Sequence, residues 1–172
     1  MKTITMSLMT VLLLAASSLA GDRLENDFKA IFVKHWQISK EFTLAVAEAM
    51  PADSYNFKPN PQEMSFGEMM FWLAKSNSGA CARVAGTEEM AEPASKDKQT
   101  TLKFLADSFD KCAKDIAATT PEQFEKMFDI SGGQQATGLE ILWWVFTDTA
   151  HHRGQAEVYL RVKNITPPHY RF

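Results

Sequence analysis

The chain has 172 residues and a formal net charge of −3, with 18 lysines and arginines against 21 aspartates and glutamates. This length predicts one domain with a sizeable core rather than two domains. A weakly acidic chain also argues against nucleic-acid binding, because neutralising phosphates requires a basic face.

The N-terminal residues 1–20 are typical of a secretory signal peptide. A lysine near the start is followed by an apolar run at 6–14 and a small-x-small cleavage site at 18–20. We expect cleavage after Ala20, with an uncleaved N-terminal anchor as the alternative. The mature chain, residues 21–172, then has no stable membrane span and is periplasmic or secreted.

Four later segments carry apolar residues at steps of three and four, which is typical of amphipathic helices. They cover about residues 24–50, 65–86, 97–118 and 137–164. Ser65 and Thr137 each begin a capping box with a glutamate three residues later, which predicts two helix starts. A short extra helix is expected from Pro121 to about Phe128, ending before the Ser131-Gly132-Gly133 break.

The predicted fold class is all-α. No alternation of convincing length indicates a strand, and no internal repeat is present. Four long amphipathic helices can bury their apolar faces against one another in an up-and-down four-helix bundle, with some crossing connections and the short helix before the last long one. Ligand sites in such bundles are built from inward side chains on facing helices.

The two cysteines, Cys81 and Cys112, leave two interpretations open. An oxidising compartment favours a disulfide between them. Both also lie on apolar helical faces, where free cysteines are commonly buried.

The last predicted helix holds the main candidate for a site, the pair Asp148 and His152. Side chains four positions apart share a helix face, so the two could bind one divalent metal ion such as zinc, iron, nickel or manganese. The alternative is an Asp–His hydrogen bond that braces the helix. His35 lies on the apolar face of the first helix. It could be a third metal ligand or, alternatively, a hydrogen-bonded core histidine.

Further polar and aromatic side chains predict a pocket around this pair. The candidates are Trp72, Asn77, His151 and Gln155. Trp143 and Trp144 could contribute to its lining, although aromatic residues at helical spacing usually belong to the core. Neither cysteine lies in a CxxC motif, so a nucleophilic thiol is not indicated.

Several motifs resemble the DinB-like superfamily over about residues 27–168. They are Phe66-Gly67-Glu68, Ala74-Lys75-Ser76-Asn77, His151-His152-Arg153-Gly154-Gln155, Tyr159-Leu160-Arg161 and Pro167-Pro168. The resemblance implies a four-helix bundle and, in many members, a divalent metal held by three histidines, one on the second helix and an HxxxH pair on the last. It also implies metal-dependent thiol transferases or hydrolases among the relatives, and common homodimers.

The sequence departs from this family pattern at two of the three ligand positions. Trp72 stands where the second-helix histidine is expected, and Asp148 replaces the first histidine of HxxxH, so only His152 remains. An indole has an N–H donor but no lone pair for a metal. We therefore expect a degenerate site in a non-catalytic binding or scaffold module for an unknown small molecule. The alternative is a divalent-metal-dependent transferase or hydrolase that uses Asp148 and His152, so enzymatic activity stays open.

Overall fold

The computed structural model describes residues 28–172, so the predicted signal peptide lies outside the described residues. The chain divides into two units, residues 1–32 and 33–172, and the account below concerns the second unit. None of the described helices is both long and apolar enough to cross a membrane.

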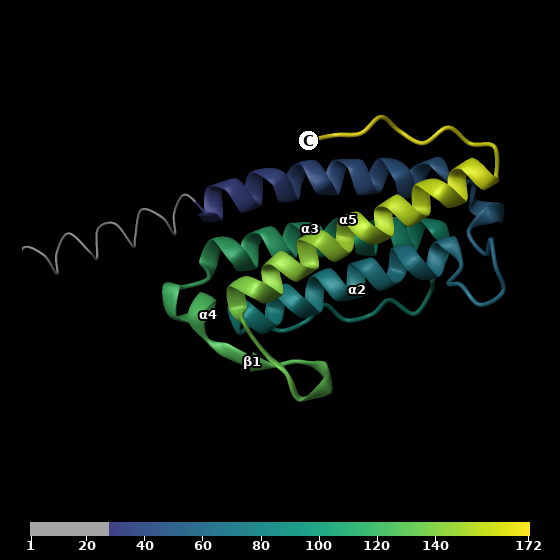
Figure 1. Cartoon of the computed structure of the whole chain (residues 1–172). Coiled ribbons are helices and arrows are strands. Elements are labelled where there is room, and N and C mark those ends of the chain that lie inside the picture. Colours follow the sequence, from purple (N-terminus) through teal and green to yellow (C-terminus); the bar gives the residue numbers. More distant parts are fainter. Residues whose placement is uncertain (1–27) are drawn as a thin grey trace, which may run out of the picture. The chain divides into compact units, whose positions relative to one another are not determined.

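Four long helices make up most of the described part of the chain, and the all-α bundle is confirmed (Figure 1). They are a first helix at residues 28–49, α2 (Phe66–Ala85), α3 (Lys98–Ala118) and α5 (Gly138–Val162). The capping boxes at Ser65 and Thr137 are both present, because each hydroxyl accepts from the backbone N–H three residues later and the glutamate there accepts from the cap. A 3₁₀ turn at Ala52–Ser54 follows the first helix.

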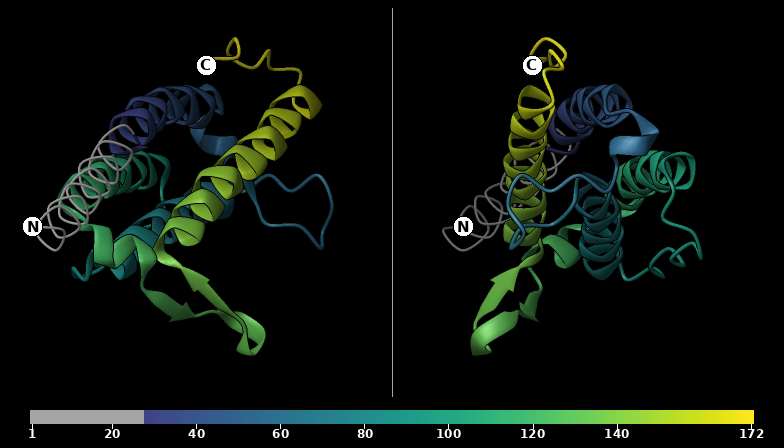
Figure 2. Two further views of the ribbon diagram at one scale, coloured as in Figure 1. Left: turned by 60° about the vertical axis from the view of Figure 1, so that its left-hand side comes forward. Right: turned by 90° about the vertical axis from the view of Figure 1, so that its right-hand side faces the viewer.

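The segment before α5 differs from the prediction. The short helix α4 (Pro121–Glu125) ends earlier than expected, and a β-hairpin follows it, formed by β1 (Met127–Asp129) and β2 (Gln135–Thr137). A 3₁₀ turn at Ser131–Gly133 joins the strands, with positive φ at two glycines. Strands of three residues are too short to show a detectable alternation in the sequence. The hairpin extends away from the helices (Figure 2).

The helix directions correct the up-and-down expectation. Phe71 and Phe104 have ring centroids 5.0 Å apart, and Cys81 and Cys112 are joined about two to three helical turns further along both helices. Contacts that advance together in both sequences mean that α2 and α3 run parallel. The connection at residues 86–97 is therefore the crossing one, because it leads from the end of α2 back to the level where α2 begins.

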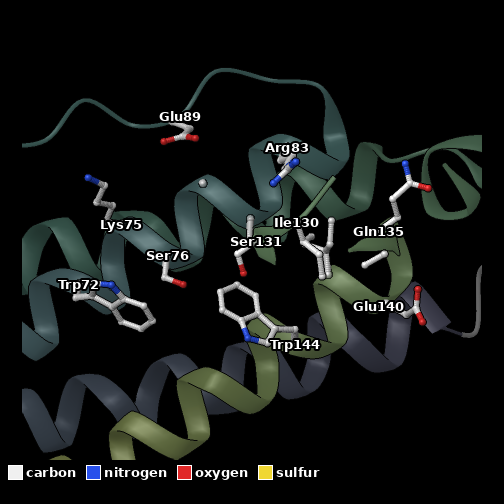
Figure 3. A pocket seen from close by; sticks show the side chains of 14 residues that line it. Trp72, Lys75, Ser76, Arg83, Glu89, Ile130, Ser131, Gln135, Glu140 and Trp144 are labelled. Atoms are coloured by element: carbon white, nitrogen blue, oxygen red, sulfur yellow. The ribbon is translucent and has the colours of Figure 1, made fainter. Parts of the chain in front are cut away.

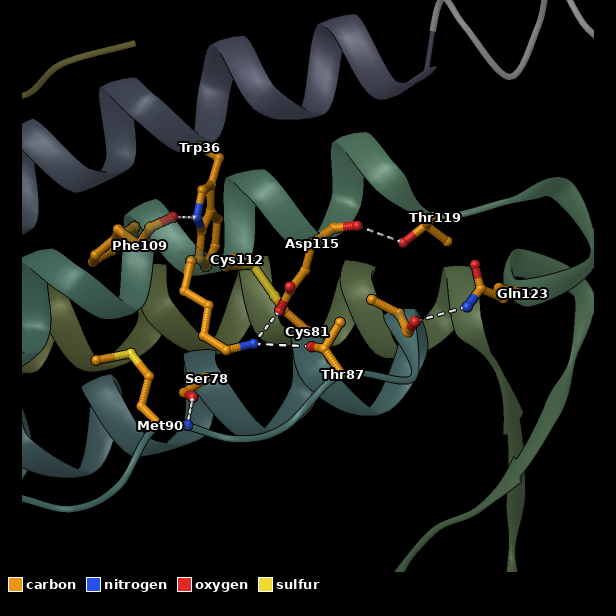
Figure 4. Close-up of polar contacts among 12 residues, drawn as sticks. Trp36, Ser78, Cys81, Thr87, Met90, Phe109, Cys112, Asp115, Thr119 and Gln123 are labelled. Carbon is orange, nitrogen blue, oxygen red and sulfur yellow. Dashed lines mark hydrogen bonds and ion pairs between the residues drawn. A yellow bond between two sulfur atoms is a disulfide. The ribbon is translucent and has the colours of Figure 1, made fainter.

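The core is closed by contacts between helices that lie far apart in the sequence (Figure 4). The Trp36 indole is 1% exposed and donates through Nε1 to the Phe109 carbonyl oxygen at 3.0 Å, which links the first helix to α3. The fully buried Cys81–Cys112 disulfide links α2 to α3. Of the two interpretations of these cysteines, the disulfide is therefore the one that the structure contains.

Candidate functional site

Helices α2 and α5 run antiparallel, and two hydrogen bonds fix their register. The Tyr159 hydroxyl donates to the Met64 carbonyl at 2.9 Å, and the Thr149 hydroxyl donates to Asn77 Oδ1 at 3.0 Å. Residue numbers therefore rise along α2 from Met64 to Asn77 while they fall along α5 from Tyr159 to Thr149. This register places the first turns of α2, including Trp72, level with the middle of α5.

The predicted pair Asp148 and His152 is close together on α5 and partly shielded from solvent. His152 Nε2 lies 3.6 Å from Asp148 Oδ1, and the side chains are 15% and 14% exposed. The other ring nitrogen, Nδ1, lies 2.7 Å from Gln155 Oε1, so Gln155 orients the imidazole. The ring of Trp72 meets that of His152 edge-on, with centroids 4.7 Å apart.

The Asp148 carboxylate has one oxygen without a hydrogen-bond partner in the described chain. Its Oδ2 is buried and has no hydrogen-bond partner within residues 28–172. Burial raises the pKa of Asp148 above its ordinary value of 3.8, while the nearby charges of His152 and His151 act in the opposite direction. The folded chain therefore binds the Asp148 proton more tightly than the unfolded chain does.

Asp148→Asn is expected to increase the free energy of unfolding at pH 7. A raised pKa in the folded state means that Asp148 costs no stability below its unfolded pKa, costs progressively more as the pH rises from there to the raised value, and costs a constant amount above it. The amide keeps the size of the side chain and cannot ionise. Urea unfolding at pH 3 and pH 7 measures the effect. A gain of the same size at both pH values would show that it does not come from ionisation.

The predicted third ligand, His35, lies elsewhere. Its half-buried ring packs against Phe172 of the C-terminal segment, with centroids 4.9 Å apart. Trp36, one position later, takes the inward place that the periodicity suggested for His35. Across the described residues, no group of three or more His, Cys, Asp or Glu side chains could hold a metal ion.

The other predicted pocket residues separate into two roles. Asn77 is fully buried and bonded through Oδ1 to Thr149, so it joins the helices from inside, although its Nδ2 has no partner in the described chain. His151 is exposed and its ring lies 5.0 Å from that of His152. The next residue of the same motif, Arg153, is buried and donates to Ser39 on the first helix.

A cavity of about 740 Å³ lies beside this group, between α2, α5 and the hairpin (Figure 3). Its lining includes Trp72, Ser76, Arg83, Ile130, Gln135 and Trp144. Of the four predicted pocket residues, only Trp72 contributes to the lining. Trp143 is 68% exposed and does not contribute. The hairpin residues were missed, because nothing in the sequence indicated that this segment folds back beside α2.

These features define a helical-bundle protein with a side-chain site between α2 and α5. Residues 35–156 match the DinB superfamily, and the chain belongs to that superfamily.

Two relatives place the chain more closely. It is 26% identical over 133 residues to the uncharacterized protein YjoA of Bacillus subtilis (strain 168), covering 75% of this chain and 86% of YjoA. The crystal structure of YjoA, a DinB-like protein, superposes with a TM-score of 0.67 at 21% identity, covering 81% of this chain and 96% of that one. A DinB-like protein from Bacillus cereus ATCC 10987 also gives a TM-score of 0.67, at 17% identity over 81% and 95% of the two chains. At 21% and 17% identity, these two structural likenesses show that the fold is shared.

Proposed function

We propose that this DinB-superfamily protein is a non-catalytic binding module in which a tryptophan has replaced part of the metal site common in the family. The observation that carries the proposal is the contact of Trp72 with His152, with ring centroids 4.7 Å apart. The indole occupies the place from which the second-helix ligand would approach His152. It supplies bulk there and no lone pair.

The donor set around His152 does not fit a resident divalent ion. Protein metal sites of this kind use three or four ligands, and within the described residues Asp148 and His152 are not joined by a third His, Cys, Asp or Glu side chain placed to share an ion with them. The other close partner of the imidazole is Gln155, an uncharged amide that binds Nδ1. Each lost ligand lowers the expected affinity for metal.

The proposed location is the periplasm or the exterior of the cell. The signal-like residues 1–20 support it, and so does the buried Cys81–Cys112 bridge, because disulfides persist mainly in oxidising compartments. A protein in that location with an open cavity between its helices is suited to bind a small molecule.

The double variant Trp72→His/Asp148→His is expected to create tight metal binding in a protein that otherwise has none. It adds one imidazole on α2 and one on α5, which together with His152 make three. Wild type should hold much less than one ion per chain after exposure to zinc, nickel or manganese, followed by desalting. The double variant should hold about one ion, with at least a hundredfold lower Kd by calorimetry.

Trp143→His/Asp148→His is the matched control, because it builds the same pair of imidazoles at positions 148 and 152 but places the third one at the exposed position 143 of α5, about 100° around the helix from that pair. It should bind metal much more weakly than the Trp72 variant, because it supplies only the two ligands of the pair. If the Trp72 variant gains no more than this control, the site is wrongly located. If wild type holds one ion per chain and His152→Ala releases it, the proposal is wrong.

The second candidate is a divalent-metal-dependent transferase or hydrolase that uses Asp148 and His152. It is favoured by one observation, the buried Asp148 Oδ2 that has no hydrogen-bond partner within the described residues. Such an oxygen would accept either a proton or a cation. Stoichiometric metal in the wild-type protein is the result that would support this candidate.

A further inference from the structure

We infer that the cavity between α2, α5 and the hairpin binds a neutral, planar aromatic molecule that carries one hydrogen-bonding group. This inference rests on the proposed binding function and adds the chemical class of the ligand. Three features of the lining lead to it: two indole rings, an unpaired hydroxyl and charges that cancel.

The aromatic part of the argument concerns Trp72 on α2 and Trp144 on α5, which both line the cavity (Figure 3). Trp144 is 48% exposed, although an indole is among the largest apolar surfaces that a protein can bury. Ile130 from the hairpin and Ile141 from α5 add aliphatic surface to the same space. A flat aromatic ring can cover these groups and stack on an indole, and about 740 Å³ is in the range of pockets for small ligands.

The hydrogen-bonding part of the argument concerns Ser76, one helical turn after Trp72. Ser76 is one of the residues that line the cavity, and its Oγ is buried and has no hydrogen-bond partner in the described part of the chain. In Figure 3 the hydroxyl points toward the space that the two indoles border. Buried hydroxyls in proteins almost always have a partner. A ligand hydroxyl or carbonyl group at this place would supply it.

Four charged groups line the cavity, and three of them already have partners in the chain. Lys75 forms an ion pair with Glu92, with Nζ and Oε1 2.5 Å apart. Glu140 accepts from the backbone N–H of Thr137 at 2.7 Å as part of the α5 cap.

The other two charged groups, Arg83 and Glu89, have opposite signs. Arg83 donates to the Asp129 carbonyl, and the carboxylate of Glu89 lies beside Gly79 of α2. The lining therefore has no excess of either sign. A net charge on the ligand would meet attraction from one of these groups and repulsion from the other, with no net gain to offset its loss of hydration, so the class that fits is neutral.

N-phenyl-1-naphthylamine is a suitable probe, because it is neutral and aromatic and its fluorescence rises when it leaves water. Titration into the purified protein should give saturable binding with quenching of tryptophan fluorescence. Trp144→Ala should weaken binding at least tenfold. Ala136→Trp, which adds bulk from the hairpin side of the cavity, should weaken it as well, so the result does not depend on one variant.

Trp143→Ala is the matched control. It removes the neighbouring indole on the same helix, which is outside the cavity lining. Binding should be unchanged. If Trp143→Ala removes binding while Trp144→Ala does not, the probe is adsorbed on the outer face of α5 and the inference is wrong. The absence of saturable binding by wild type would also overturn it.

The polar group is tested with 1-naphthol and naphthalene. Wild type should prefer 1-naphthol about fivefold, which corresponds to one hydrogen bond, and Ser76→Ala should remove that preference. Binding of 1-naphthoate or 1-naphthylmethylammonium that is tenfold tighter than that of 1-naphthol would exclude a neutral ligand.

Metal content measured on the same preparations separates the two proposals. A metal-free protein that binds none of the aromatic probes contradicts only the ligand class. Stoichiometric metal contradicts the proposed function itself.

Discussion

The double variant Cys81→Ala/Cys112→Ala will unfold with a free energy about 3–4 kcal/mol lower than that of wild type. The bridge closes a loop of 31 residues, and in the chain-entropy account such a cross-link restricts the unfolded chain by about this amount. Both cysteines are fully buried, so removal of the sulfur atoms adds a packing loss between α2 and α3. Urea unfolding followed by circular dichroism measures the difference.

Reductant supplies the control for this prediction. Wild type unfolded and refolded in dithiothreitol should approach the stability of the double variant, while the variant itself should not respond to reductant. Alanine is the appropriate replacement, because a serine hydroxyl at these positions would be buried without an evident partner. Equal urea midpoints for oxidised and reduced wild type would show that the bridge contributes nothing to stability.

The helices could be predicted from the sequence because each carries two independent signals. Apolar residues recur at three and four positions, and the side chains of Ser65 and Thr137 cap the backbone where α2 and α5 begin. Both signals are local, and the structure confirms both. Helix direction is not local. The connection at residues 86–97 is compatible with a parallel or an antiparallel neighbour, and only contacts such as Cys81 with Cys112 decide between them.

The candidate site was partly predictable for the same reason. Asp148 and His152 approach each other because four residues make about one helical turn, which the spacing alone indicates. The placement of His35 failed because adjacent residues differ by about 100° around a helix, and the larger apolar side chain of Trp36 takes the interior. The hairpin that forms one wall of the cavity could not be predicted, because each of its strands has only three residues and leaves no detectable alternation in the sequence.

Gly138→Ala is expected to lower the free energy of unfolding by about 2–3 kcal/mol, the upper part of the range for overpacking a well-packed site. Gly138 is the first residue of α5 and is buried where the chain passes α4. A Cβ at this position would overlap the Gln123 carbonyl oxygen and lie 3.0 Å from Val84 Cγ1. The oxygen belongs to the backbone, so relief requires α4 and the start of α5 to separate. Urea unfolding measures the loss.

Gly154→Ala, in the same helix, is the matched control and should have the opposite sign. Gly154 lies inside α5, is exposed, and a Cβ there would meet no atom within 4 Å. Alanine in a helix interior is more favourable than glycine by about 0.8–1 kcal/mol, so this variant should be more stable than wild type. A small gain from both substitutions would mean that α4 does not press on the start of α5. A gain from Gly154→Ala with a loss from Gly138→Ala would locate the close packing of α5 at the end that supports the hairpin wall of the cavity.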